Sequence, residues 1–342
     1  MTYVTRATEM TTGPGNANEA RALFYLMGQD EDRDEMSLYI VDVFNDLVGS
    51  NNNATRLWDL QSKNAKSGPK NIGKELVTLF RNYMSEFRPH FVRQILFLGS
   101  VTGTVRRDES MVSFRYEDIK EVAQNNLRIG LKEELLSKTY IDNECVTDGN
   151  IDEFLRNVEF VVVDRDNASY VRPLIGAASE KLVDDRKLTA IFNEVRDMQS
   201  SKKSITCEGV ELSRPHEVFK LGKHLSRKSI LRLVLARIIN RDPISSGIPT
   251  SFLSVYQSYP PEQAEEMLED CQNALALQMF DKNAKEAFWD LFDRIIEIVT
   301  KDKMLDPEAV YNLIDSDLLT KCVHLDPLST QFFIAQIKDG LK

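Results

Sequence analysis

A strand–helix–strand succession between residues 56 and 101 limits the fold most narrowly. Arg56–Ser62 is rich in strand-forming residues, and Ile72–Phe87 repeats its apolar residues at helical spacing after the chain break Ser67-Gly68-Pro69. The short apolar run "HFVRQILFLGSV" then follows, bounded by glycines. A crossover helix that leads into a buried strand is typical of a mixed sheet with helices on its faces. We therefore expect an α/β fold.

The preceding residues add a helix and a further strand. Asn16–Met27 is predicted to be a helix that ends at Gly28, and Leu38–Val48 is rich in Val, Ile, Tyr and Phe, as strands are. The intervening "GSNNN" predicts a turn, because Gly and Asn tolerate positive φ, and it would make the two strands an antiparallel hairpin. The expected order is helix, strand, strand, helix, strand.

After this core the pattern becomes mostly helical. We expect one more strand at Val158–Asp164, and helices at Tyr116–Ala123, Leu127–Ser137, Lys181–Gln199 and Ser226–Asn240. Prolines, serines and a glycine at 241–251 predict a linker. Beyond it, prolines at N1 positions introduce further helices, predicted at Pro261–Met279, Ala284–Thr300, Pro307–Ile314 and Pro327–Ile337. The predicted domains are an α/β domain (1–240) and a smaller all-α domain (252–342).

Charge is distributed unevenly between these parts. The net charge is −10, and residues 260–342, with 17 Asp or Glu against 8 Lys or Arg, carry nearly all of it. Two stretches are basic: Lys63–Arg93 has 7 Lys or Arg and 2 Glu, and Lys202–Arg237 has 9 and 3. Clustered positive charge suits phosphate binding, although a solvated basic helix face would give the same composition.

Several classes of protein are disfavoured. The 4 cysteines and 4 histidines are scattered, which argues against a zinc ribbon, a disulfide framework or a compact histidine metal site. The first residues, "MTYVTRATEM", lack the pattern of a secretory signal, and no apolar run approaches the roughly 20 residues needed to span a bilayer. We therefore expect a cytoplasmic protein without a membrane segment.

The hairpin "VDVFNDLVGSNNNATRLWDLQSKN" places groups suited to metal chemistry at one end of the sheet. Asp46 on the first strand can face Gln61 and Lys63 on the second, because alternate residues of a strand share a face. Carboxylate and amide oxygens bind Mg²⁺, and a lysine can orient the attacking water or stabilise charge on phosphorus. Asp42 and Asp59 are the fallback carboxylates. A polar strand end would have the same residues without any such role.

The surroundings favour the nuclease interpretation. Glu19, on the helix before the hairpin, could add a second carboxylate, and Lys66, Lys70 and Lys74 follow closely enough to contact phosphates that flank the scissile one. The element order approaches the αβββαβ core of restriction-endonuclease-like enzymes, with one strand unassigned.

The segments "NEARALFYLMG", "YIVDVFNDL", "LWDLQSKN" and "GKELVTLFRNYM" through "ILFLGS" carry a resemblance. Residues 16–104 resemble the double-stranded-DNA endonuclease domain of bacterial anti-phage effectors, a branch of the PD-(D/E)xK superfamily that accepts Q-x-K in place of E-x-K. These are nuclease subunits of CBASS-type and, most similarly here, Lamassu-type ABC three-component systems. The resemblance implies that Asp46, Gln61 and Glu19 bind Mg²⁺ or Mn²⁺ and that Lys63 is the catalytic lysine. The neutral Gln61 should weaken metal binding.

The C-terminal domain departs from the CBASS effectors. It is short, helical and acidic, and no G-x-x-x-x-G-K-[ST] phosphate loop occurs in the chain. The resemblance therefore implies a DNA endonuclease that an SMC-like ATPase and an accessory subunit hold inactive until it is triggered, and that oligomerises in order to break both strands. Two alternatives stay open: a non-catalytic adaptor with the nuclease fold, and a DNA-binding regulator that acts through Lys202–Arg237.

Overall fold

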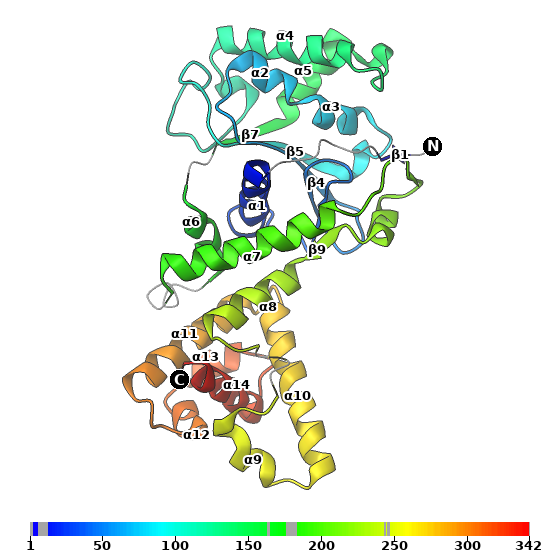
Figure 1. The fold of residues 1–342 in the computed structure, drawn as a ribbon. Coiled ribbons are helices and arrows are strands. Elements are labelled where there is room, and N and C mark those ends of the chain that lie inside the picture. The colour runs from blue at the N-terminus through cyan, green and yellow to red at the C-terminus, as the bar shows by residue number, and fades with distance from the viewer. Residues whose placement is uncertain are drawn as a thin grey trace. The chain divides into compact units, whose positions relative to one another are not determined.

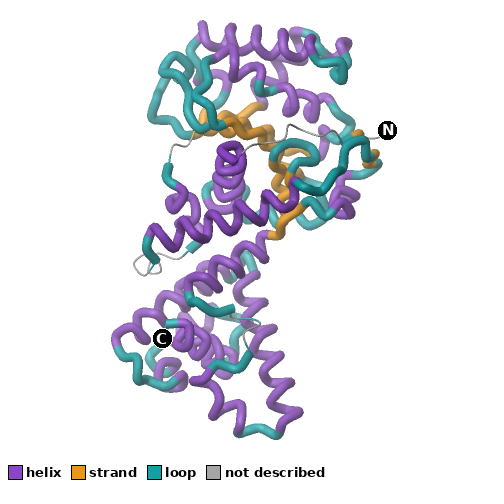
Figure 2. The backbone as a smooth tube through the Cα atoms, viewed as in Figure 1, coloured by secondary structure: helices purple, strands orange, loops and turns teal. Residues whose placement is uncertain are grey.

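The computed structural model describes residues 3–5, 13–162, 165–175, 183–242, 244 and 247–341. They belong to two compact units, the first within residues 1–170 and 192–227 and the second within 171–191 and 228–342. The first holds a mixed sheet with helices, and the second is helical (Figures 1 and 2). The expected α/β class with a helical C-terminal region is confirmed. The division falls at residues 227 and 228, ahead of the predicted linker at 241–251, and residues 171–191 group with the second unit.

The main sheet of the first unit has the order β6-β7-β5-β4-β3-β2-β9. Strands β4, β5 and β7 are parallel to one another, and the other neighbours pair antiparallel. A separate short pair joins β1 to β8. The strands are β1 (Tyr3–Val4), β2 (Leu38–Val41), β3 (Leu47–Ser50), β4 (Leu57–Lys63), β5 (Phe91–Leu98), β6 (Ser113–Phe114), β7 (Val158–Val162), β8 (Glu211–Leu212) and β9 (His224–Ser226).

The helices account for most of the remaining chain. The first eight in sequence are α1 (Gly13–Gly28), α2 (Pro69–Lys74), α3 (Val77–Met84), α4 (Glu121–Ser137), α5 (Asp148–Asn157), α6 (Asn167–Val171), α7 (Asp185–Lys203) and α8 (Arg227–Ile238). The second unit continues with α9 (Leu253–Gln257), α10 (Pro261–Phe280), α11 (Lys285–Lys301), α12 (Pro307–Tyr311), α13 (Ser316–Lys321) and α14 (Pro327–Gly340). The chain passes between the two residue sets within α6, α7 and α8.

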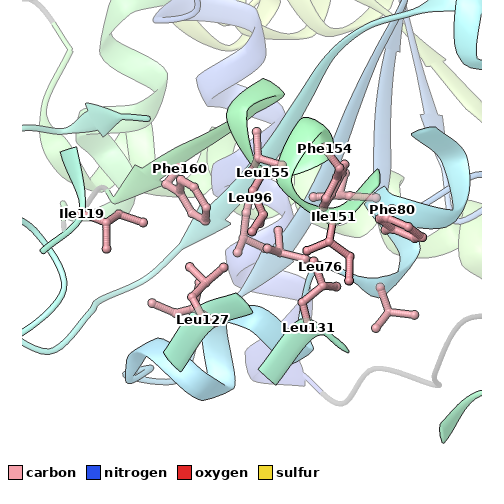
Figure 3. Close-up of a cluster of buried hydrophobic side chains, with 14 of the residues drawn as sticks. Leu76, Phe80, Leu96, Ile119, Leu127, Leu131, Ile151, Phe154, Leu155 and Phe160 are labelled. Atoms are coloured by element: carbon pink, nitrogen blue, oxygen red, sulfur yellow. The ribbon is translucent and has the colours of Figure 1, made fainter. Parts of the chain in front are cut away.

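Helices cover both faces of the main sheet. On one face, side chains from α2 to α5 pack on β5 and β7 in a continuous apolar core, where Leu96 and Phe160 meet Leu127 (Figure 3). On the other face, α1 packs through Tyr25, whose ring centroid lies 5.6 Å from that of Phe97. Because both faces are covered, β2 to β5 are buried along most of their length, as strands of covered sheets are.

Helices α2 and α4 approach so closely that only glycine fits at two positions. A Cβ on Gly73 would lie 2.0 Å from the carbonyl oxygen of Leu127, and one on Gly130 would lie 2.1 Å from that of Lys70. Backbone stands against backbone at these points, which leaves little room for either helix to shift. The C-terminal end of α2, next to the end of β4, is thereby fixed.

The prediction of one strand over Leu38–Val48 is wrong. The run forms two antiparallel strands, β2 and β3, joined by bends at residues 42–46, where Asp42 has φ 55°. The loop residues Val43 and Phe44 are apolar and buried in a second core cluster, distinct from the one that α2 to α5 form. For this reason the composition of residues 38–48 is that of one continuous strand. Residues 42, 44 and 46 therefore do not share a strand face. Because the run is divided into β2 and β3, the structure has one more strand before β4 than the sequence predicted.

Other boundaries differ in smaller ways. The predicted helix Ile72–Phe87 is divided into α2 and α3 by a turn at Glu75 and Leu76. The two helices expected within 116–137 are one, α4, preceded by a 3-10 turn at Tyr116–Asp118. The turn between β3 and β4 has its positive φ at Ala54, not at a Gly or Asn, while the Asn51 side-chain oxygen accepts from the Thr55 backbone N–H at 2.9 Å. Helix α13 was not expected.

Candidate active site

The end of β4 meets α1 and the residue that precedes β3. The Asp46 Oδ2 accepts hydrogen bonds from the Gln61 side-chain amide and from the Ser62 backbone N–H, each at 2.8 Å. The Ser62 hydroxyl in turn accepts from the Asn18 side-chain amide at 3.1 Å, which ties α1 to the strand. The predicted juxtaposition of Asp46 and Gln61 is present. The loop at residues 42–46 positions Asp46 there, whereas the prediction had placed Asp46 on a strand.

Glu19 lies at the same place. It follows Asn18 on the inner face of α1, is almost completely buried, and forms an ion pair through Oε2 with the Lys203 ammonium. Glu19 and Lys203 both act electrostatically on the Asp46 carboxyl. The sequence analysis did not single out Lys203. Its only signal in the sequence was membership of the basic stretch Lys202–Arg237, because no local pattern predicts that the end of α7 lies beside α1.

Lys63 is the last residue of β4, and its ammonium lies 3.1 Å from Glu75 Oε2 at the end of α2. Both side chains are about one-third exposed, and the charge of Lys63 also acts on Asp46. The predicted catalytic lysine is therefore partly exposed, and its ion-pair partner is the acid that follows α2. Glu75 is a further acid that the sequence analysis did not assign.

The electrostatics of Asp46 follow from this enclosure. Burial and the neighbouring charge of Glu19 raise the pKa of Asp46 to about 7, while the Ser62 hydrogen bond and the two ammonium groups of Lys63 and Lys203 act in the opposite direction. With a pKa near 7, the Asp46 carboxyl is half protonated at neutral pH. A cation bound beside it would keep it ionised. Strongly perturbed carboxyls of this kind are common at functional sites.

A buried hydrogen-bond network holds the Asp46 loop in place. Asp59 Oδ1 accepts from Asn45 at 2.9 Å, and Asp59 Oδ2 accepts from Asn82 at 2.7 Å. Asn82 also donates to the Phe44 carbonyl at 3.0 Å, and its own side-chain oxygen accepts from the Tyr3 hydroxyl at 2.7 Å. The Asn45 side-chain oxygen accepts from the Asp46 N–H at 3.0 Å. We call this set the Asn82 network: it joins β1, β4 and α3 to the loop.

The two fallback carboxylates lie outside the candidate site. Asp59 is completely buried in the Asn82 network, and burial raises its pKa to about 7. Asp42 forms an ion pair with the buried Lys223 at 3.6 Å. Both carboxylates have partners of their own in the fold, which agrees with a structural role for each.

The predicted phosphate-contacting lysines lie on or beside α2. Lys66 is exposed in the loop after β4, and Lys70 and Lys74 are exposed on α2. Lys70 pairs with Glu133 at 2.8 Å and Lys74 with Glu134 at 3.9 Å, both on α4. Surface ion pairs are weak, so these contacts leave the lysines able to exchange partners with a phosphate.

The second basic stretch is only partly a solvated surface. Lys203 meets Glu19, the buried Lys223 donates to the Ile205 carbonyl at 2.9 Å, and Arg227 donates to the Met27 and Arg33 carbonyls at 2.9 and 3.0 Å. Lys203, Lys223 and Arg227 thus form contacts within the first unit. The composition of Lys202–Arg237 overstates the positive charge that is available to nucleic acid.

The donor set of the site is two carboxylates and one amide. The Gln61 Oε1 is buried and has no hydrogen-bond partner among the described residues. Oxygen donors from Glu19, Asp46 and Gln61 suit a hard divalent cation such as Mg²⁺. Among the residues that the structure describes, no group of three or more His, Cys, Asp or Glu side chains is arranged to hold a metal. A metal here would need the Gln61 amide oxygen.

Comparisons with family models, curated proteins and solved structures give no match for this chain. No helix within the described ranges has both the length and the apolar character needed to cross a bilayer.

Proposed function

We propose that the chain is a metal-dependent DNA endonuclease of the restriction-endonuclease-like type. The order α1, β2, β3, β4, α2 and α3, β5 supports the fold, with β2 to β4 antiparallel and β5 parallel to β4. This is an αβββαβ succession with the candidate site at the end of its third strand, where the motif residues of the superfamily are expected. Division of the Leu38–Val48 run provides the third strand of that succession.

The observation that carries the proposal is the convergence of four predicted residues. Asp46 and Gln61 are hydrogen-bonded, Glu19 is close enough to raise the pKa of Asp46, and the charge of Lys63 acts on the same carboxyl. These residues come from α1, the loop before β3, and β4. A merely polar strand end does not require an acid from a separate helix.

Each residue has a definite role in this mechanism. Glu19, Asp46 and the Gln61 amide oxygen would hold Mg²⁺, which supplies Lewis acidity toward a phosphoryl oxygen and a bound water. For this, the Gln61 side-chain amide must turn so that its oxygen, not its nitrogen, faces Asp46's side of the site. Lys63 holds its partly exposed ammonium beside Glu75, where it can stabilise negative charge that develops on phosphorus.

DNA as the substrate rests on the resemblance and on the exposed lysines of the α2 region. Lys66, Lys70 and Lys74 lie beyond Lys63 along the chain, and phosphate contacts of this type position a duplex without reading its sequence. The anti-phage role, the SMC-like ATPase and the accessory subunit stay predictions of the resemblance.

Cleavage of plasmid DNA tests the proposal. The full chain should nick or linearise plasmid in Mg²⁺ or Mn²⁺, and Lys63→Ala should reduce the rate at least about 100-fold, as the loss of a group that stabilises transition-state charge does. The matched control is Lys132→Ala, a surface lysine of α4 that pairs with Asp148 at 2.7 Å and should cut at the wild-type rate. Equal cleavage by Lys63→Ala and wild type would contradict the proposal.

One observation favours the adaptor as a second candidate. The Gln61 amide nitrogen donates directly to Asp46, so the carboxylate has a side-chain partner without a cation. An adaptor that kept the fold after losing catalysis would be expected to close its site in this way. Calorimetric titration with Mg²⁺ separates the two functions: the nuclease has a binding isotherm that Asp46→Asn abolishes, and the adaptor has none.

A further inference from the structure

We propose that the Lys203 ammonium is a built-in counter-ion of the candidate metal site, which a divalent cation must displace in order to bind. The inference rests on the proposed function and adds a form of regulation to it. It concerns a residue that the expected motif does not contain.

The position of Lys203 is the first argument. It is the last residue of α7, and its ammonium reaches Glu19 Oε2 inside the first unit. The side chains are 16% and 3% exposed, so this pair is largely withdrawn from water. An ion pair in such surroundings is held much more strongly than a surface pair, because solvent screens it less.

The charge balance of the site is the second argument. The carboxylates of Glu19 and Asp46 face the ammonium groups of Lys63 and Lys203, and Lys63 also pairs with Glu75 at 3.1 Å. Gln61 stands where the E-x-K pattern has a carboxylate and adds no charge. A site whose carboxylates already have ammonium partners attracts a divalent cation less than one whose carboxylates have none.

Competition for the same oxygen is the third argument. The Lys203 ammonium contacts the Glu19 carboxylate oxygen, a group that the proposed metal also needs. A lysine ammonium is a point charge on a flexible four-carbon stem and can leave such a contact without moving the backbone. Metal binding therefore exchanges one cation for another at Glu19. Anything that draws Lys203 away would raise the affinity for metal.

Metal titration of charge variants tests this directly. Lys203→Met should bind Mg²⁺ at least about tenfold more tightly than wild type by calorimetry. Lys203→Arg keeps the charge and should bind as weakly as wild type. The neighbouring Lys202→Met is the control for loss of a charge at the end of α7, and it should not change the affinity. Equal or weaker binding by Lys203→Met would overturn the proposal, and would show that Lys203 only positions Glu19.

A second measurement uses the wild-type chain and does not depend on a variant folding. Amine acetylation followed by mass spectrometry should show Lys203 modified faster when Mg²⁺ is present, while Lys202 is modified at an unchanged rate. An unchanged rate for Lys203 under Mg²⁺ concentrations that support cleavage would overturn the inference. The two proposals fail in different ways. If only this inference is wrong, the chain still cuts DNA and Lys63→Ala still reduces the rate. If the proposed function is wrong, Lys63→Ala and wild type cut equally or neither cuts.

Discussion

Two groups of carboxylates pack beside the main sheet, and different cations pair with them. Near the start of β5, Arg93 donates to Asp30 at 2.9 Å and Asp32 at 3.2 Å, and it also pairs with Glu159 on β7. We call this set the Arg93 cluster. At the end of β4, Glu19 and Asp46 face lysines instead. Both groups have carboxyls whose pKa values are raised by burial, to about 6 at Asp30 and about 7 at Asp46.

The choice of cation separates a structural cluster from a candidate site. The Arg93 guanidinium is a planar fork that joins several acids at once, and it is 11% exposed. The Trp58 indole N–H also donates to Asp32 at 2.8 Å, which fixes that carboxylate. The lysines of the candidate site are single-point partners, each pairing with one carboxylate. A fixed fork suits a permanent cross-link, and an exchangeable ammonium suits a site that a ligand enters.

Replacing Arg93 should give the largest effect on stability. Arg93→Met removes the cation that Asp30, Asp32 and Glu159 share, and because Asp30 and Glu159 are buried, breaking this ion network should cost about 3–5 kcal/mol. Urea denaturation at pH 7 measures the loss. The matched variant Lys63→Met, at the half-exposed end of the sheet, should lose less than about 1 kcal/mol. Equal losses would remove the distinction between the two clusters.

The Arg93 cluster should also make stability depend on pH in the direction set by Asp30. Burial raises the pKa of Asp30 from 3.8 to about 6, so the folded state binds the proton more tightly than the unfolded state. This contribution to stability is complete below pH 3.8 and is lost as pH rises through about 6. The shift corresponds to about 3 kcal/mol over that window.

Asp30→Asn isolates this contribution. Unfolding free energies of the variant and wild type should differ by an amount that changes between pH 4 and pH 7, with wild type losing stability relative to the variant as pH rises. A difference that is constant with pH would contradict the assigned titration. The comparison between the variant and wild type cancels the titration of carboxyls outside the Arg93 cluster.

The Asn82 network should show how far the candidate site depends on its support. Asn82→Ala leaves Asp59 with one donor fewer and frees the Phe44 carbonyl and the Tyr3 hydroxyl, which should cost about 2 kcal/mol. The Asp46 loop would lose its anchor to α3, so Mg²⁺ binding should weaken more than the fold does. Asn45→Ala provides a second test through the loop itself. Full metal affinity in both variants would show that Asp46 is positioned without the network.

The sequence predicted the parts of the site that depend on short-range order. Gln61 and Lys63 share β4, and Glu19 lies on a helix whose end at Gly28 was foreseen. The sequence could not reveal the loop at residues 42–46, because Val43 and Phe44 are as apolar as strand residues and are buried. The role of Lys203 could not be predicted, for a different reason. Its contact with Glu19 depends on the packing of α7 against α1, which no local pattern encodes.

The smallest effects should come from the lysines of the α2 region. Lys66→Ala should reduce the slope of log binding constant against log salt concentration by about 0.9, the loss of one phosphate contact on duplex DNA. Lys70→Ala should reduce it less, because Lys70 must first leave Glu133, with which it pairs at 2.8 Å. Fluorescence anisotropy with a short duplex across a salt series gives both slopes. A larger change for Lys70 than for Lys66 would place the DNA path along α2, away from the loop that follows β4. In either case the phosphate contacts come from exposed lysines, and the buried cations of the two clusters take no part in them.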